Sequence, residues 1–237
     1  LGIFFLVPLI YFSFKIGFSK LSKIYFIFLL ICFQGFMGWY MVSSGLVERV
    51  DVSHFRLSAH LIIAFIILSL IFWNFLNLNL SNNYIIKINF YLPSFFLLII
   101  FLQIIMGAFV SGMDAGTIYN SWPLMGNSYF PDDNNLINLF TFSAFSEPSI
   151  VQFLHRNLAY LILIFYLFIL YKVYKNKIIG SYNSIKIIGI ILILQIILGI
   201  LTLLYGAQIY FASMHQICSI FLVSSCIYFL YLNSDTN

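Results

Sequence analysis

Seven apolar stretches, separated by polar joins, follow one another along this chain. They cover about residues 1–14, 24–46, 56–76, 90–112, 148–171, 185–205 and 208–232. Each is a continuous apolar run rather than a short segment of alternating residues, which predicts membrane helices and not a β-barrel. We therefore predict an all-α, polytopic membrane protein with seven helices. The first of them is shorter than the roughly 20 residues of a full span.

The joins between the stretches differ in charge, and this predicts the orientation of the helices. Lysines follow the first, third and fifth stretches: Lys15, Lys20, Lys23, Lys87, Lys172, Lys175, Lys177 and Lys186. The other joins carry the acidic residues: Glu48, Asp51, Asp114, Asp132, Asp133 and Glu147. Because loops rich in lysine remain in the cytoplasm, the odd-numbered helices should run from outside to inside. The C-terminus should then be cytoplasmic.

The long join of residues 113–147 should lie outside the membrane. Its segments "YNSWPLM" and "YFPDD" combine turn-forming residues with aromatic ones. A loop of this length is usually functional or disordered. The tryptophan and the prolines favour an ordered cover over a site.

An internal repeat relates the two ends of the chain. Two pairs of segments match: "QGFMGWYMVSSG" (34–45) with "QIILGILTLLYG" (195–206), and "FRLSAHL" (55–61) with "YFASMHQ" (210–216). The match places His60 over His215, so the second and third helices correspond to the sixth and seventh. The first helix should then correspond to the fifth, and the fourth to a helix before residue 1.

The repeat predicts two pseudo-repeated four-helix bundles, of which the first helix is missing. Residues 1–112 should form the N-terminal half-bundle together with a linking helix. Residues 113–147 should form the extracytoplasmic loop, and residues 148–237 the C-terminal half-bundle. The QxxxG elements of the repeat also offer a small residue for close helix packing, which is the simplest explanation of such a pattern.

The composition agrees with a membrane protein. Of the 237 residues, 62% are hydrophobic and only 8% are charged, whereas a soluble domain needs far more charge on its surface. The net charge of +4 comes from loop lysines without a basic cluster, so we expect no nucleic-acid partner. Cys32, Cys218 and Cys226 lie in apolar stretches without CxxC spacing, so we expect packing roles and no disulfide.

The beginning of the chain resembles the end of a helix. It starts with Leu-Gly and shows neither the charged region nor the cleavage site of a signal peptide. We therefore expect the sequence to be a fragment of a longer protein.

Three histidines lie inside predicted helices at equal depth. His60, His155 and His215 each follow the start of an outside-to-inside helix by about seven to nine residues, on the order of 10–14 Å below its outer end. Ionisable groups inside a membrane are unfavourable and usually functional. A hydrogen bond to a neighbouring helix explains one such histidine, but three at one depth favour a functional role in ligand binding. His54 lies in the acidic join, and we expect it to be solvated.

Haem is the ligand that these histidines suit best. Imidazole is the usual neutral ligand of haem iron and of copper. A copper site favours added cysteine or methionine, and Met214 points to a different helix face from His215. Two facing histidines lined by Phe, Leu and Gly suit a bis-histidyl haem. Arg56 and Arg156 lie near the same depth, where they either pair with haem propionates or extend to the outer headgroups.

These residues resemble the haem A synthase family of the second, mitochondrial and alpha-proteobacterial type. The matching segments follow the family's order and cover nearly the whole chain: "GWYMVSSGL", "RLSAHL", "LQIIMGAFVSGMDAG", "YNSWPLM", "QFLHRNLAY", "LQIILGILTLL" and "MHQ". The patterns "AGxxYNxWPLM" and "QFxHRxxAY" are specific, whereas a QxxxG element alone is a weak signal.

The resemblance implies eight helices in two four-helix halves, with both termini cytoplasmic. It implies that His155 and His215 ligate the iron of a haem b cofactor in the C-terminal half, with Arg156 beside them. It implies that the N-terminal half binds a substrate haem, with His60 as a ligand and Arg56 on the same helix face.

One motif of the family is missing from this sequence. The family carries Glu–x–x–His–Arg just before the position of "LGIFFLVPLIYF", and its glutamate is the residue implicated in catalysis. The repeat places Gln152 where that glutamate would stand. Glutamine cannot exchange a proton at working pH. The C-terminal half therefore suits electron transfer, and the N-terminal half suits the catalytic reaction.

The implied function is an oxidoreductase that converts the methyl group of haem O to the formyl group of haem A for cytochrome oxidase assembly. The implied location is the bacterial inner membrane, or the mitochondrial inner membrane in a eukaryote. The implied partners are haem O, membrane lipid, haem O synthase and oxidase assembly factors, and a homo-oligomer is an open alternative.

Two other functions fit parts of the pattern. A bis-histidyl b-type cytochrome that only transfers electrons predicts two equivalent haems and no carboxylate in either half. A small-molecule transporter fits the repeat but predicts broken helices and polar residues at the middle of the membrane, where this chain has Ile, Leu and Phe.

Overall fold

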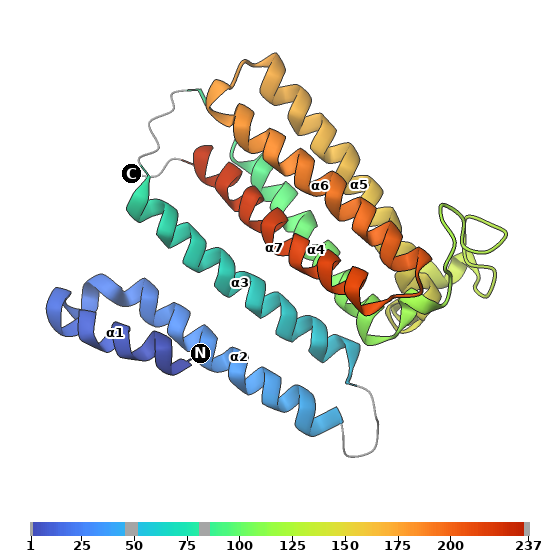
Figure 1. Cartoon of the computed structure of the whole chain (residues 1–237), viewed down its shortest axis with the longest axis horizontal. Helices are drawn as coiled ribbons and strands as arrows, with labels where there is room; N and C mark the ends of the chain where they lie inside the picture. The colour runs from blue at the N-terminus through green and yellow to red at the C-terminus, as the bar shows by residue number, and fades with distance from the viewer. Residues whose placement is uncertain (1, 46–51, 81–85, 235–237) are drawn as a thin grey trace.

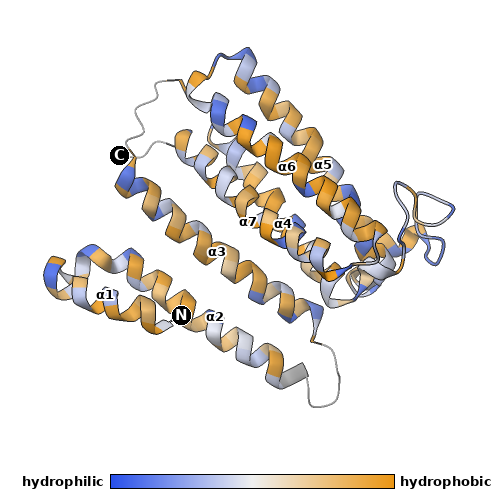
Figure 2. Ribbon diagram, viewed as in Figure 1, coloured by the Kyte–Doolittle hydropathy of each residue, from blue (hydrophilic) through white to orange (hydrophobic). Residues whose placement is uncertain are grey.

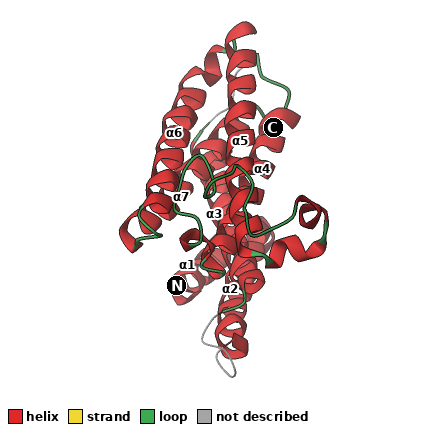
Figure 3. Cartoon of the chain, turned by 90° about the vertical axis from the view of Figure 1, so that its right-hand side faces the viewer, coloured by secondary structure: helices red, strands yellow, loops and turns green. Residues whose placement is uncertain are grey.

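The computed structural model describes residues 2–45, 52–80 and 86–234, and within these ranges helices joined by loops make up the chain (Figure 3). The α-helices are α1 (Gly2–Ile16), α2 (Ser22–Gly45), α3 (His54–Asn79), α4 (Tyr91–Gly112), α5 (Pro148–Lys175), α6 (Tyr182–Leu204) and α7 (Ile209–Leu232). Six of these described helices are long and apolar enough to cross a membrane, and α1 is shorter. The predicted all-α, multi-span architecture is confirmed. Glu48 and Asp51, used for the orientation, lie outside the described residues.

The helices lie side by side in one assembly (Figure 1). In one group of four, α4 packs on α5 and α7, and α6 packs on the same two helices. Beside this group, α3 packs on α4 and α7, α2 packs on α3, and α1 packs on α2. The helix predicted to link the two halves, α4, thus contacts helices on both sides. The division into two half-bundles stays a prediction.

The buried core joins α3 to the four-helix group. Phe96 of α4, Ile169 of α5, Ile188 of α6 and Val223 of α7 are fully buried in it. Apolar side chains also cover the outside of the helices, as Phe4 shows with 87% of its surface exposed. Figure 2 shows apolar residues along the helices and polar ones gathered at their ends. Such a distribution is expected for helices that a bilayer surrounds.

The packing role predicted for the cysteines fits Cys218 and Cys226 but not Cys32. Cys218 and Cys226 are buried, Cys32 is exposed, and all three thiols are free.

The lysine-bearing joins meet at one end of the assembly. Lys87 donates from Nζ to the main-chain oxygen of Ser234 at 2.7 Å, and Asn233 donates from Nδ2 to Ser181 Oγ at 3.0 Å. The end of α7 is therefore tied to the joins that follow α3 and α5. The 113–147 loop and the turn between α6 and α7 lie at the opposite end (Figure 1). The predicted alternation of the two kinds of join is confirmed for the described residues.

The three histidine-bearing helices begin where the sequence predicts. Ser53 occupies the N-cap position of α3, without a hydrogen bond from its side chain. Pro148 is the first residue of α5, where a fixed φ and a missing N–H are both favourable. Gly206 and Ala207 have φ values of 63° and 58°, so the chain turns sharply between α6 and α7. Ala207 N–H donates to the oxygen of Thr202 at 2.8 Å, which closes the end of α6.

Gly189 of α6 provides a test of the packing between α5 and α6. A Cβ atom at this position would overlap the hydroxyl group of Tyr166, which donates to the oxygen of Ile185 at 3.2 Å. We expect Gly189→Ala to lower the free energy of unfolding by about 1–3 kcal/mol. The measurement is the thermal unfolding temperature in detergent, with Gly35→Ala as the control because a Cβ there meets nothing within 4 Å. Adding Tyr166→Phe should recover part of the loss. Equal unfolding temperatures for the two glycine variants would contradict this packing.

Candidate functional site

His60, His155 and His215 lie toward the same end of the assembly. They belong to α3, α5 and α7, and each follows the first residue of its helix by six or seven residues. That end carries the 113–147 loop (Figure 1). All three side chains are partly buried. The three histidines therefore lie at nearly equal distances along their helices, and their equal depth in a membrane stays a prediction.

The histidines of α3 and α5 each contact a glutamine on the preceding helix. Gln34 Nε2 lies 2.9 Å from the main-chain oxygen of His60 and 3.1 Å from its ring Nε2. Gln103 Nε2 lies 3.0 Å from the main-chain oxygen of His155 and 3.4 Å from its ring Nε2. The same two contacts therefore join α2 to α3 and α4 to α5.

The third histidine has a similar partner. Gln195 Nε2 lies 3.4 Å from His215 Nε2, and His215 Nδ1 lies 3.1 Å from the main-chain oxygen of Gln195. A glutamine thus faces a histidine in each of three helical hairpins: α2–α3, α4–α5 and α6–α7. This supports the predicted equivalence of His60 and His215.

A glycine four residues after each glutamine makes room for the imidazole. A Cβ atom at Gly38 would lie 3.1 Å from Cε1 of His60. The corresponding distances are 3.2 Å from Gly107 to His155 and 3.0 Å from Gly199 to His215. Because unstrained carbon contacts are about 3.5–4.0 Å, each imidazole lies against the bare backbone of its neighbouring helix. We call this unit of glutamine, glycine and facing histidine the Gln–Gly–His unit.

His155 and His215 lie on helices that face each other across the four-helix group. Both α5 and α7 pack on α4 and on α6, which makes them the diagonal pair. Two neutral nitrogen ligands on facing helices of an apolar bundle suit haem iron. Within the described residues, no cluster of three or more His, Cys, Asp or Glu side chains offers another metal site.

Several buried polar atoms of these units lack a hydrogen-bond partner in the described structure. They are Nδ1 of His60 and of His155, and Oε1 of Gln34, Gln103 and Gln195. Buried polar atoms are paired in most proteins, and exceptions are concentrated at functional positions. These unpaired atoms, together with the neutral imidazole nitrogens that can ligate iron, fit sites that bind a haem.

Arg156, the residue after His155, binds the extramembrane loop. Its guanidinium donates to the main-chain oxygens of Tyr119 and Ser121 at 2.9 Å and of Leu124 at 3.4 Å. Gln152, one turn earlier, donates to the Tyr119 oxygen at 3.1 Å. Arg156 therefore holds the loop against the outer part of α5. Its pairing with a haem propionate stays a prediction.

The loop is folded onto the helices, as predicted for a cover, and it faces the viewer in Figure 3. Trp122 donates from Nε1 to the hydroxyl of Tyr160 in α5 at 2.9 Å. Tyr119 donates to Asp133 within the loop at 2.9 Å. Desolvation, together with this hydrogen bond, raises the pKa of Tyr119, so its hydroxyl remains protonated and keeps donating at neutral pH.

Arg56 lies one turn before His60 on α3. Its guanidinium carbon is 4.7 Å from the centroid of the Tyr40 ring, which places the charge over an aromatic face. Because residues four apart share a face of a helix, Arg56 and His60 point to the same side of α3. The predicted pair is therefore brought together, and its role stays a prediction.

The expectation that His54 is solvated is wrong. His54 is the first residue of α3, and its ring packs 4.2 Å from Phe55 and 5.2 Å from Phe109, measured between centroids. Its Nε2 atom is buried. The reason is Gly112 at the end of α4: a Cβ there would lie 2.9 Å from the Cα atom of His54. The glycine lets the start of α3 approach closely.

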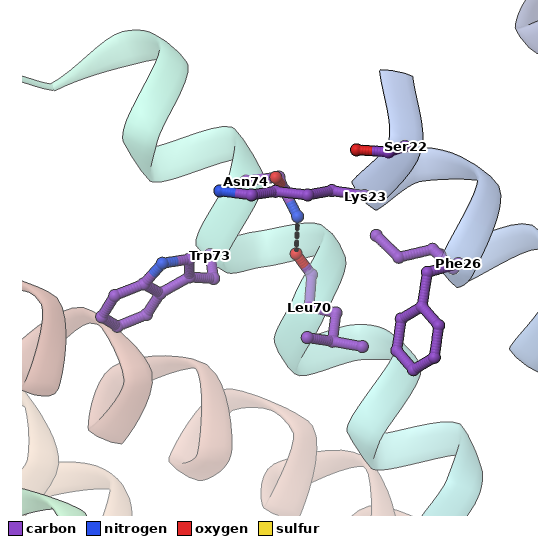
Figure 4. Close-up of a pocket in the computed structure, with 7 residues that line it drawn as sticks. Ser22, Lys23, Phe26, Leu70, Trp73 and Asn74 are labelled. Carbon is purple, nitrogen blue, oxygen red and sulfur yellow. Dashed lines mark hydrogen bonds between the residues drawn. The ribbon is translucent and has the colours of Figure 1, made fainter. Parts of the chain in front are cut away.

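A cavity of about 440 Å³ lies between α2 and α3 at their lysine-bearing end. Figure 4 shows Lys23 extending beside Asn74, whose side-chain amide donates to the oxygen of Leu70 at 2.7 Å. Ser22, which also lines the cavity, precedes Gln34 by twelve residues, or about 18 Å of helix. This cavity is distant from the histidines. Its lining lacks the ligand chemistry of the Gln–Gly–His units, which therefore identify the candidate site.

The contact between Gln103 and His155 was not predicted from the repeat. The sequence "LQIIMG" has the same QxxxG spacing as the second and sixth helices, and that spacing is the signal that indicates a third unit. The binding of Arg156 to loop carbonyls left no such signal, because main-chain acceptors carry no residue identity.

The chain is similar to a known family along nearly its whole length. The model of the COX15-CtaA family, described as "Cytochrome oxidase assembly protein", matches residues 1–227. A "Heme A synthase" of Pelagibacter ubique (strain HTCC1062) is 47% identical over 236 residues, which are 99% of this chain and 70% of the relative. A "Heme A synthase" of Rickettsia bellii (strain OSU 85-389) is 43% identical over 237 residues, 96% of this chain and 69% of the relative. No solved structure matches significantly.

Arg156 provides a test of how the loop is held. Hydrogen bonds from a charged group each contribute about 1.5–3 kcal/mol, so Arg156→Leu should release residues 119–124. We expect their amide hydrogens to exchange at least about tenfold faster, since a factor of ten corresponds to about 1.4 kcal/mol. Hydrogen-exchange mass spectrometry measures this. Arg56→Leu is the control, because Arg56 lies on α3 over Tyr40. If both variants exchange alike in this segment, Arg156 does not hold the loop.

Proposed function

Because this chain belongs to the COX15-CtaA family of cytochrome oxidase assembly proteins, we propose that it acts as a haem A synthase. It is an oxidoreductase of the bacterial inner membrane, crosses that membrane several times, and converts haem O to haem A. The observation that carries the proposal is the set of three histidines at one depth, each in a Gln–Gly–His unit. Such a set offers ligands for more than one haem.

The C-terminal group, α4 to α7, suits the cofactor. His155 and His215 would hold a haem b across α5 and α7, which are the diagonal helices of that group. When bound, such a haem supplies a route for the electrons that leave the substrate as its methyl group is oxidised to a formyl group. Gln152 cannot exchange a proton at working pH, and its amide binds the loop oxygen of Tyr119. The group therefore offers ligation and cover rather than acid–base chemistry.

The N-terminal helices suit the substrate. His60 would bind the iron of haem O from α3, and Arg56 on the same face would bind a propionate or hold the substrate in place. Tyr40, from α2, already contacts the Arg56 guanidinium. In this division residues 1–112 carry the substrate site, residues 148–237 carry the cofactor site, and the 113–147 loop covers the outer end of the latter. Haem O synthase is the expected source of the substrate, and oxidase assembly factors are the expected consumers of the product.

The cofactor assignment is tested by removing either ligand. His155→Ala and His215→Ala should each abolish the low-spin b-type absorption of the purified protein, because one axial ligand cannot maintain a bis-histidyl iron. Reduced-minus-oxidised spectra and haem extraction measure this. Unchanged b-type spectra in both variants would exclude this pair as the ligands.

The substrate assignment is tested at His60. In cells that supply haem O, His60→Ala should retain haem b and lower the yield of haem A at least about tenfold, which corresponds to about 1.4 kcal/mol of transition-state stabilisation. Chromatography of extracted haems measures the yield. His54→Ala is the matched control on the same helix, since His54 packs on Phe109 and lies outside the Gln–Gly–His units. A normal yield of haem A from His60→Ala would make His60 a packing residue. A loss of haem b from His60→Ala, as from His155→Ala and His215→Ala, would instead favour an electron-transfer cytochrome with two equivalent haems.

A further inference from the structure

We propose that the glutamine and the glycine of each Gln–Gly–His unit are positioning residues for the facing histidine. Together they hold the imidazole against its neighbouring helix, and the glutamine amide must leave Nε2 before a haem iron takes its lone pair. The positioning pairs are Gln34 with Gly38, Gln103 with Gly107, and Gln195 with Gly199. The inference rests on the proposed function, because it concerns how the same histidines become ligands.

The orientation of the glutamine amides follows from their partners. Gln34 Nε2 lies 2.9 Å from the main-chain oxygen of His60, and Gln103 Nε2 lies 3.0 Å from that of His155. A main-chain oxygen only accepts, so the amide must present its nitrogen and not its oxygen at this point. The same nitrogen lies 3.1 Å from Nε2 of His60 and 3.4 Å from Nε2 of His155.

The tautomer of these two histidines follows in turn. An amide nitrogen donates and does not accept, so the ring Nε2 that it approaches must carry the lone pair. The ring proton is then on Nδ1. In both units Nδ1 is buried and has no partner in the described structure. The glutamine contact thus favours this tautomer, at 3.1 Å in His60 and at 3.4 Å in His155.

His215 reaches the same tautomer by another route. Its Nδ1 lies 3.1 Å from the main-chain oxygen of Gln195, and that oxygen can only accept. The proton is therefore on Nδ1, and Nε2 again keeps its lone pair. A main-chain partner of this kind is the usual way to orient a metal-binding histidine. The side chain of Gln195 adds a weaker contact at 3.4 Å.

The glycines set the position of the ring. At Gly38, Gly107 and Gly199, the three atoms nearest to an added Cβ all belong to the facing imidazole. The space left by the missing side chain is therefore filled by the histidine ring. Other described glycines do not face an imidazole in this way: Gly189 faces Tyr166, and Gly35 faces open space. A methyl group at any of the three positions would push the ring away from its helix.

Alanine at each glycine tests the inference, with Gly35→Ala as the matched control on α2. We expect Gly107→Ala and Gly199→Ala to lower haem b content about 10- to 100-fold, the range seen when the supporting shell of a metal ligand is removed, or to shift the electron paramagnetic resonance of the low-spin iron. Gly38→Ala should keep haem b at the level of Gly35→Ala and lower the yield of haem A. This division follows from the assignment of His60 to the substrate.

A second pair of variants remains informative if the alanine variants do not accumulate. Methionine has nearly the shape of glutamine and donates no hydrogen bond. Gln103→Met removes the amide that binds the main-chain oxygen of His155, whereas His215 keeps its main-chain partner in Gln195→Met. We expect Gln103→Met to shift the midpoint potential and the paramagnetic resonance of haem b more than Gln195→Met does. Equal and negligible shifts in the two variants would overturn the inference.

The outcomes separate the inference from the proposed function. If His155→Ala and His215→Ala lose haem b while Gly107→Ala and Gly199→Ala match Gly35→Ala, the ligands are correct and the positioning role is wrong. If the histidine variants retain haem b, the proposed cofactor site itself is wrong. The first result bears only on the inference made here.

Discussion

An imidazole inside a bilayer must find its hydrogen-bond partners within the protein, because the hydrocarbon offers none. In this chain each intramembrane histidine meets a glutamine of the preceding helix, and two of those glutamines also bind the histidine's own main-chain oxygen. The contact joins two helices at one level and so fixes their relative height. The close approach at the glycines depends on that level being correct. Helix register and ring position are therefore set by one small group of contacts.

This arrangement explains how a chain of almost entirely apolar helices can form specific sites. Between helices in lipid there is little hydrophobic driving force, so small residues and interhelical hydrogen bonds supply the specificity. The helix hairpin supplies both in this protein, and the same hairpin occurs three times. The repeated unit visible in the structure is thus smaller than a four-helix half. Differences between the halves arise from what surrounds the unit: loop-binding side chains near His155, and Arg56 with Tyr40 near His60.

The sequence predicts the helices and the depth of the histidines well, since both depend on local pattern. Long apolar runs separated by charged joins determine the spans, and helix starts at Pro148 and at Gly206–Ala207 set the depth of the rings. The partners of the polar groups are less predictable. Arg156 binds main-chain oxygens of a distant loop, and a main-chain acceptor is the same whatever the residue. His54 was misplaced because its burial depends on Gly112 of another helix, which no local pattern reveals.

The spacing of the paired residues along the chain has a consequence for how the sites assemble. Gln195 and His215 are 20 residues apart, whereas Gln103 and His155 are 52 apart because the 113–147 loop intervenes. Closing the longer segment is entropically less favourable by about 0.8 kcal/mol. The tight Gly206–Ala207 turn brings its two helices together as a single inserting hairpin. The contact between Gln195 and His215 therefore needs only this hairpin, whereas the contact between Gln103 and His155 also requires the outer loop to close.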